Sequence, residues 1–231
     1  MNKRETHSKY VWPDLVVMEF LTAVALTVIL MVWALLINAP LLEIASPGIS
    51  ENPSKAPWYF VGLQELLVYF DPWIAGVMIP MIIVLCLMMI PYLDNNPEGS
   101  GRYSFTVRKF AVVNFIFGFS MWWLLILAGY FFRGPNWQLY WPWESWETVK
   151  VTEESLWSLS PEAGFASLVI YFGLGMFLPY LLNKNLYRKF GSIRYLIVML
   201  SLLLMYAVPI KILLRLLFNI KYLLVTPWFN L

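Results

Sequence analysis

Apolar residues follow one another in long runs, and these runs predict the elements of the chain. An α-helix needs about 20 residues to cross the roughly 30 Å apolar core of a bilayer. Five runs approach or exceed that length, and we expect transmembrane helices near residues 14–38, 73–93, 110–133, 163–182 and 195–217. The fifth helix needs the turns beyond Lys211 to complete a span, because its uncharged run ends at Ile210.

The composition places this pattern in a membrane. Of the 231 residues, 60% are hydrophobic and only 13% are charged. So few charges cannot coat a soluble globule, and the remaining apolar surface must meet lipid. We therefore predict an all-α integral membrane protein. The net charge of +2 is too balanced to indicate a nucleic-acid partner, and we expect none.

Basic residues gather in alternate loops, and this asymmetry predicts the orientation. Loops rich in Lys and Arg stay on the cytoplasmic side. We expect a bacterial inner (cytoplasmic) membrane, a cytoplasmic N-terminus, and residues 39–72 and 134–162 on the opposite side. The basic residues of the predicted cytoplasmic side are Lys3, Arg4, Lys9, Arg102, Arg108, Lys109, Lys184, Arg188, Lys189 and Arg194. The opposite loops hold Lys55, Arg133 and Lys150 with the acidic Glu43, Glu51, Glu65, Asp71, Glu144, Glu147, Glu153, Glu154 and Glu162.

Histidine and cysteine are too scarce for most metal chemistry. The chain has one His, His7, and one Cys, Cys86. Haem b in a membrane bundle needs paired axial ligands, usually two His, so this chain cannot hold such a haem alone. One Cys allows neither an intrachain disulfide nor a cysteine metal cluster.

Residues 51–72, ENPSKAPWYFVGLQELLVYFDP, are the most informative segment. Pro57 suits a first helical turn, and we predict a short interfacial helix over 57–70, too short to span. At helical spacing its apolar residues share one face, while Gln64 and Glu65 lie near Pro57. Such a helix either lines a site for an amphipathic ligand or is a connector whose Trp and Tyr favour the interface.

Two short motifs resemble a known family. The first is Asn52-Pro53 followed by Ala56-Pro57-Trp58-Tyr59-Phe60; the second is Ile90-Pro91-Tyr92-Leu93-Asp94 followed by Asn96-Pro97. Their order and spacing resemble the C-terminal half of cytochrome b, equivalent to subunit IV of the cytochrome b6f complex. We therefore divide the chain into a subunit IV-like region, 1–135, and a further region, 136–231, with a Trp-rich loop and two more helices.

The resemblance implies a haem-free subunit of a quinol:cytochrome c-type oxidoreductase that is not active alone. It would form part of the quinol-oxidation pocket and support electron transfer coupled to proton translocation. The implied partners are a haem-binding cytochrome b6-like subunit, a Rieske iron–sulfur protein and a cytochrome c-type subunit, within membrane lipid. Haem b and the iron–sulfur cluster would lie on those partners, and quinol in a shared pocket. The implied pocket residues are Pro57, Trp58, Tyr59, Phe60 and Gln64.

The segment departs from the family at one position that matters. The family's Glu before Trp-Tyr is thought to accept a quinol proton, and Pro57 stands in that place. Glu65, about two turns further on, is the nearest carboxylate of the predicted helix and the candidate proton acceptor. Alternatively, Glu65 faces water or pairs with a basic residue of a partner.

Other features leave further alternatives open. The chain could instead be a structural or assembly subunit without a direct quinone role. The loop from Trp137 to Trp146 suggests a rigid interfacial lid or docking surface, and Arg133 is expected to contact a lipid phosphate. Lys211, Arg215 and Asn219 form a polar stripe that lies in the interface, contacts a partner or snorkels. Close helix packing is expected at Gly118, Gly129, Gly173 and Gly175.

Overall fold

The computed structural model describes residues 10–38, 41, 44–94, 96, 98, 104–146, 148–150 and 155–231. Some residues used in the sequence predictions lie outside these ranges. They are Lys3, Arg4, His7, Lys9, Glu43, Pro97, Arg102, Glu147, Glu153 and Glu154, and the side chain of Lys189 is likewise not described.

The described residues fold into helices, and five of these are long and apolar enough to cross a membrane. The five spans are Val11–Leu36, Ile74–Leu93, Lys109–Phe131, Pro161–Leu182 and Ser192–Phe218. The predicted fold class, an all-α integral membrane protein with about five spans, is confirmed. The division at residue 135 stays a prediction.

Contacts divide the chain into two units, residues 1–50 and 51–231. The first unit holds α1 (Val16–Leu36), preceded by the turn η1 (Val11–Leu15). Asp14 and Glu19 lie in the opening turns of this span, where carboxylates are favoured by the positive end of the helix dipole.

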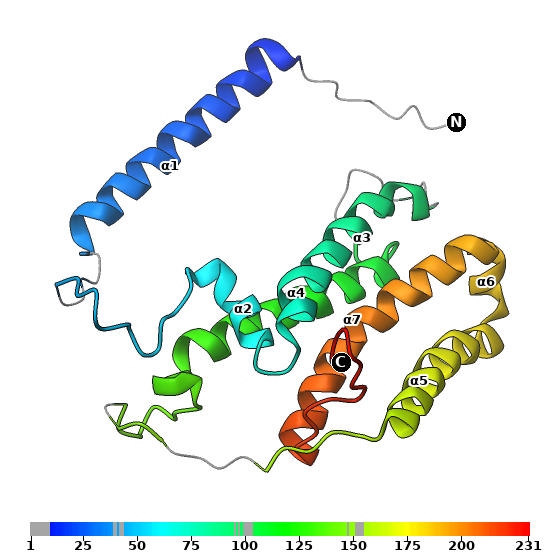
Figure 1. The fold of residues 1–231 in the computed structure, drawn as a ribbon. Coiled ribbons are helices and arrows are strands. Elements are labelled where there is room, and N and C mark those ends of the chain that lie inside the picture. The colour runs from blue at the N-terminus through cyan, green and yellow to red at the C-terminus, as the bar shows by residue number, and fades with distance from the viewer. Residues whose placement is uncertain are drawn as a thin grey trace. The chain divides into compact units, whose positions relative to one another are not determined.

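The second unit contains the remaining helices (Figure 1). Their bounds are α2 Trp58–Leu66, η2 Ile74–Met78, α3 Ile79–Leu93, α4 Lys109–Phe131, η3 Pro135–Trp137, α5 Pro161–Leu182, α6 Lys184–Phe190 and α7 Ser192–Phe218. Local sequence sets several ends. Ser160 caps α5 by accepting a hydrogen bond from the Ala163 amide, with Pro161 in the first turn. Gly191 has a φ of 74°, which a glycine adopts without strain, and it separates α6 from α7.

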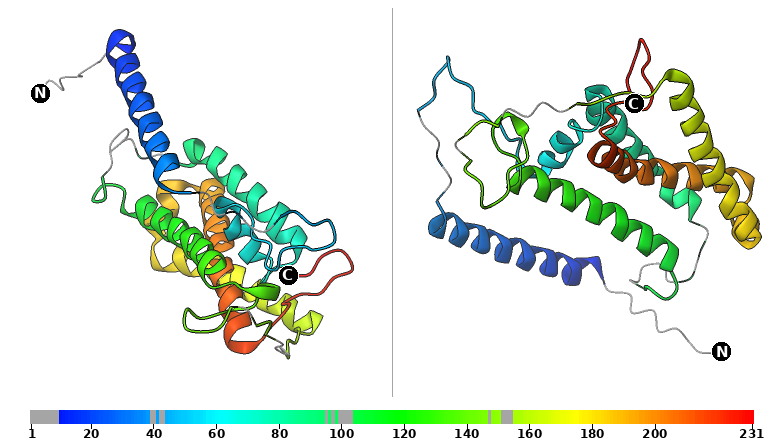
Figure 2. Two further views of the ribbon diagram at one scale, coloured as in Figure 1. Left: turned by 90° about the vertical axis from the view of Figure 1, so that its left-hand side faces the viewer. Right: turned by 90° about the horizontal axis from the view of Figure 1, so that it is seen from below.

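Helix α7 packs against several helices of the second unit. It contacts α3, α4, α5 and α6 (Figures 1 and 2, in orange). Polar contacts tie it to three of them: Ser201 lies against Cys86 of α3, Tyr206 donates to Asn114 of α4, and Tyr171 of α5 donates to the Leu203 carbonyl. The fifth span therefore packs against three other spans of this unit, α3, α4 and α5.

Glycines allow some of these approaches. A Cβ built on Gly175 would lie 2.3 Å from Leu203, and one on Gly118 would lie 3.1 Å from Met205 Sδ. A Cβ on Gly129 would lie 2.5 Å from Val61. The prediction of close packing is confirmed at these three positions. It is wrong at Gly173, where a Cβ would meet nothing within 4 Å.

The C-terminal segment folds back against the second unit. Trp157 and Ile220 form a backbone bridge, in which the Lys221 amide donates to the Trp157 carbonyl at 2.7 Å. The Leu231 carbonyl accepts backbone hydrogen bonds from Leu223 and Leu224, the Leu231 amide donates to the Leu224 carbonyl, and Leu231 packs beside the core.

The Lys211 side chain, 2% exposed, donates to the carbonyls of Ile220 and Lys221. Of the predicted polar stripe, Lys211 therefore neither extends to the membrane surface nor leaves its charge for a partner chain. Its ammonium group holds the chain that follows α7.

The short helix between the first two spans is shorter than the predicted 57–70. Helix α2 ends at Leu66, and residues 67–70 continue as turns whose backbone hydrogen bonds span three residues at Val68 and Tyr69 and four at Phe70. Two causes act together. Asp71 precedes Pro72, which disfavours helical backbone, and Tyr69 and Phe70 turn into the core. That core consists of Leu66, Tyr69, Phe70, Ile74, Ala75 and Leu125.

Candidate functional site

The N-terminal turn of α2 presents an exposed aromatic edge, which we define as Pro57, Trp58, Tyr59 and Phe60. Trp58, Tyr59 and Phe60 are 56%, 49% and 53% exposed. Their rings touch in sequence: Trp58 meets Tyr59 edge-on at 5.7 Å between centroids, and Tyr59 meets Phe60 at 4.7 Å. Trp58 also stacks on Trp123 of α4 at 6.1 Å. The edge is thus a continuous aromatic surface at the end of a membrane span.

Gln64 lies behind this edge and holds the chain that leads into α2. Its amide oxygen accepts from the Ala56 backbone amide at 2.9 Å, and its Nε2 donates to the Ser54 carbonyl at 2.8 Å. The Gln64 side chain therefore fixes the backbone just before Pro57, and its amide makes these bonds within the chain.

Glu65 points away from the edge into a buried polar cluster. It is 1% exposed, and its carboxylate receives two hydrogen bonds from the guanidinium of Arg133: Nη2 to Oε1 at 2.6 Å and Nε to Oε2 at 2.9 Å. The Tyr69 hydroxyl donates to Oε1 at 3.0 Å, and the Trp137 indole donates to Oε2 at 3.2 Å. Four donors within the chain thus surround this carboxylate.

Arg133 does not reach toward lipid, so the expected phosphate contact is wrong. Arg133 is 7% exposed, and its Nη1 donates a hydrogen bond to the Trp137 carbonyl at 3.0 Å. Sequence reasoning missed the Glu65–Arg133 pair because the two residues are 68 positions apart. The sequence feature that could have indicated the pair is a single Arg close to the end of an apolar run, in a loop otherwise rich in carboxylates.

The charges of this cluster stabilise one another. Burial raises the pKa of the Tyr69 hydroxyl to about 12, and the neighbouring charge of Glu65 adds to that shift. Burial alone would lower the pKa of Arg133, but the hydrogen bonds and charge of Glu65 outweigh it, so the pKa of the guanidinium is raised. The phenol is therefore held neutral and the guanidinium charged.

Further contacts clamp α2 onto the end of α4. Val61 fits against Gly129, where any side chain would collide with it. On the exposed side, Asn52 exchanges hydrogen bonds with Asn136, and the Lys55 ammonium donates to the Tyr130 carbonyl at 2.6 Å. The aromatic edge is thus carried on a helix tied down on both sides of the Val61–Gly129 contact.

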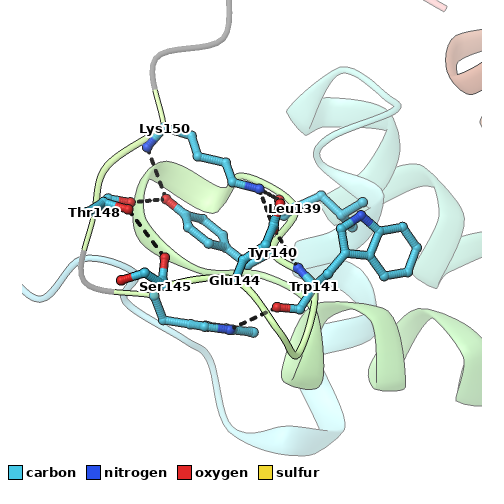
Figure 3. Close-up of polar contacts among 8 residues, drawn as sticks. Leu139, Tyr140, Trp141, Glu144, Ser145, Thr148 and Lys150 are labelled. Atoms are coloured by element: carbon cyan, nitrogen blue, oxygen red, sulfur yellow. Dashed lines mark hydrogen bonds and ion pairs between the residues drawn. The ribbon is translucent and has the colours of Figure 1, made fainter.

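The Trp-rich loop, defined as residues 132–150, has a core of its own (Figure 3). Tyr140 is fully buried, and its hydroxyl donates to the Thr148 carbonyl at 2.7 Å and accepts from the Lys150 amide at 3.1 Å. The Lys150 ammonium bonds Glu144 at 2.5 Å and lies 4.5 Å from the Tyr140 ring centroid. These contacts fit the predicted rigid loop; whether it serves as a lid or for docking stays a prediction.

The described residues hold no group of three or more His, Cys, Asp or Glu that could bind a metal ion.

Comparison with known proteins identifies the segment that carries this arrangement. Residues 51–139 match the family model described as Cytochrome b(C-terminal)/b6/petD. The cytochrome b resemblance is confirmed. The matched segment contains the aromatic edge, α3, α4 and both halves of the Glu65–Arg133 pair, while α1 and α5–α7 lie outside it. No curated protein and no solved structure matches the chain.

The cytochrome b match supports a membrane subunit of a cytochrome bc/b6f-type complex engaged in electron transport. Complexes of this type handle quinones and contain further subunits. Five apolar spans together with this match support an integral membrane protein.

Proposed function

We propose that this chain is a haem-free subunit of a quinol:cytochrome c-type oxidoreductase, and that its aromatic edge forms one wall of the quinol-oxidation pocket. The observation that carries the proposal is the exposure of Trp58, Tyr59 and Phe60 on a helix anchored at the end of a span, inside the cytochrome b-like segment. Aromatic faces and edges suit a flat quinol ring, and the exposed Tyr59 phenol offers a hydrogen-bonding group beside them.

The pocket is incomplete within one chain. A quinol gives up two electrons and two protons, so redox centres must lie within reach. We propose that a cytochrome b6-like subunit holds haem b and that a Rieske protein holds the iron–sulfur cluster. A cytochrome c-type subunit would then pass the electrons on. The single His of this chain is consistent with haem ligation by a partner.

The proton-accepting role of Glu65 stays a prediction. Its oxygens already accept four hydrogen bonds within the chain, so a quinol proton reaches them only if this cluster opens. Replacing Glu65 with Gln in the assembled complex tests the role. Loss of turnover with a changed pH–rate profile supports it, and an unchanged profile rejects it.

The pocket itself is tested by substitution at the edge. We expect Trp58→Ala to raise the KM for a short-chain quinol about tenfold, equivalent to about 1.4 kcal/mol of lost binding. Trp143→Ala is the matched control, because Trp143 is an exposed Trp of the same membrane side in the predicted orientation but belongs to the Trp-rich loop. An unchanged KM in Trp58→Ala overturns the proposal.

A scaffold role is the second candidate, and one observation favours it. Both polar side chains at the end of α2, Gln64 and Glu65, bond within the chain, as expected for a purely structural connector. Purification in a mild detergent, followed by analysis of bound quinone and haem, separates the candidates together with the edge variants. A scaffold predicts wild-type KM for every edge variant in a complex that still assembles.

A further inference from the structure

Two polar ties hold α2 against the same short stretch of chain, residues 130–137. The outer tie joins Asn52 and Lys55 to Asn136 and the Tyr130 carbonyl, and it is exposed. The inner tie joins Glu65 to Arg133, and it is buried. Exposed polar contacts exchange readily with water, so the inner tie is the one that fixes the helix.

The geometry of the inner tie defines an orientation as well as a distance. Two parallel N–H bonds from the planar guanidinium meet both oxygens of Glu65, an arrangement that a single-point donor cannot reproduce. Glu65 lies seven residues after Trp58, or about 10 Å along the helix axis. A rotation or tilt of α2 at Glu65 therefore displaces the aromatic edge.

The same guanidinium also sets the start of the Trp-rich loop. Its Nη1 donates to the Trp137 carbonyl, and the Trp137 indole returns a hydrogen bond to Glu65. The turn from Arg133 to Trp137 and the helix α2 are thus built around one ion pair. Movement of either element breaks bonds to the other.

We propose that Arg133 is a positioning residue of the quinol site, acting through Glu65 to hold the aromatic edge in place. The inference rests on the proposed function of that edge. Arg133 does not itself touch the quinol, since its side chain is buried behind α2. The Glu65–Arg133 pair then serves orientation, and Glu65 is not required to take up a proton.

Three variants test this in the purified complex with a short-chain quinol. Arg133→Lys keeps the charge but loses the paired geometry, and we expect KM to rise about tenfold while kcat and the pH–rate profile stay close to wild type. Arg133→Met leaves the Glu65 charge buried alone, and we expect a larger rise. The double variant Arg133→Met/Glu65→Met removes the tie but leaves no buried charge unpaired, so we expect a complex that assembles and a KM that stays about tenfold above wild type.

Arg108→Met is the matched control. Arg108 precedes α4 as Arg133 follows it, and it pairs with Asp94 in a partly exposed site at the other end of the helix. Its loss should leave KM unchanged. Activities are normalised to haem content, so that reduced assembly does not count as reduced binding.

Each outcome decides between roles. Wild-type KM in Arg133→Lys overturns the positioning role. Loss of kcat and of one limb of the pH–rate profile in the double variant also overturns it, and assigns proton transfer to Glu65. If Arg133→Met does not assemble, Arg133→Lys and the double variant carry the test. Failure of the proposed function is recognised separately, because Trp58→Ala would then have no effect on KM.

Discussion

Glu65 and Arg133 carry opposite charges, both are buried away from water, and each stabilises the charged form of the other. The residues are 1% and 7% exposed, and each completes hydrogen bonds of the other. Removing one member leaves an uncompensated charge in the interior, which costs far more than the net value of the pair.

We therefore predict that Glu65→Gln destabilises the folded chain by about 3–5 kcal/mol, because the Arg133 charge stays buried without its partner. The measurement is the thermal unfolding midpoint of the purified complex. Glu144→Gln is the control, since the Glu144–Lys150 pair is about 30% exposed on both sides and its loss should shift the midpoint little. Equal midpoints for the two variants would contradict the prediction.

Tyr69 makes the cluster sensitive to alkaline pH. The pKa of its hydroxyl is raised to about 12 in the fold, above the ordinary 10, so the unfolded chain loses this proton first. The stabilisation is fully present below about pH 10 and is lost as the pH rises toward about 12.

Comparison with Tyr69→Phe isolates this effect, because the variant has no phenol to ionise. We predict that the midpoint of the wild-type complex falls relative to that of Tyr69→Phe over this pH range. A constant difference between the two midpoints would show that Tyr69 does not titrate differently in the folded state.

At the scale of residues, the sequence identified Glu65 as unusual but did not identify Arg133 as its partner. A carboxylate beside an apolar helical face indicates an unusual environment, whichever residue pairs with it. The identity of the partner depends on how the end of α4 meets α2, which requires the Val61–Gly129 contact. No local pattern contains that information.

At the scale of elements, the crossing of α2 over α4 depends on one missing side chain. We predict that Gly129→Ala pushes α2 away, because its Cβ would lie 2.5 Å from Val61 Cγ1, and that it costs about 1–3 kcal/mol. Gly173→Ala is the control, since nothing lies within 4 Å of the new methyl group. The midpoint of the complex and the KM for quinol are measured together.

If α2 positions the aromatic edge as proposed, Gly129→Ala raises KM as well as lowering the midpoint. A lower midpoint with wild-type KM would mean that the edge tolerates displacement of its helix.

The existence of the helices could be predicted from the sequence, whereas the end of α2 could not. Long apolar runs fix the spans because the bilayer demands them. The end of α2 at Leu66 instead depends on Tyr69 and Phe70 turning into the core, and apolar spacing alone continues the helix to residue 70. Tertiary burial overrides local periodicity there.

At the scale of the whole molecule, hydropathy alone did not reveal that α7 packs against α3, α4, α5 and α6. Lipid and protein are both apolar neighbours, so a transmembrane run that faces other helices looks like one that faces acyl chains. The signals were the small and polar residues Ser201, Tyr206 and Lys211, each of which meets another part of the chain.

Orientation gives a further prediction. The contacts of Asn52 with Asn136 and Glu65 with Arg133 join two of the loops predicted to lie opposite the cytoplasm. In a Cys86→Ser background, we predict that Trp143→Cys reacts with a membrane-impermeant thiol reagent only from the non-cytoplasmic side. Lys184→Cys should react only from the cytoplasmic side. The reverse pattern would overturn the proposed orientation and with it the proposed side of the quinol site.

The chain that returns after α7 depends on one small residue at the start of α5. Leu231 pairs through its backbone with Leu223 and Leu224, and a Cβ built on Gly164 would lie 1.8 Å from the Leu223 carbonyl oxygen. Any side chain at position 164 would therefore displace the returning chain from the helix on which it rests.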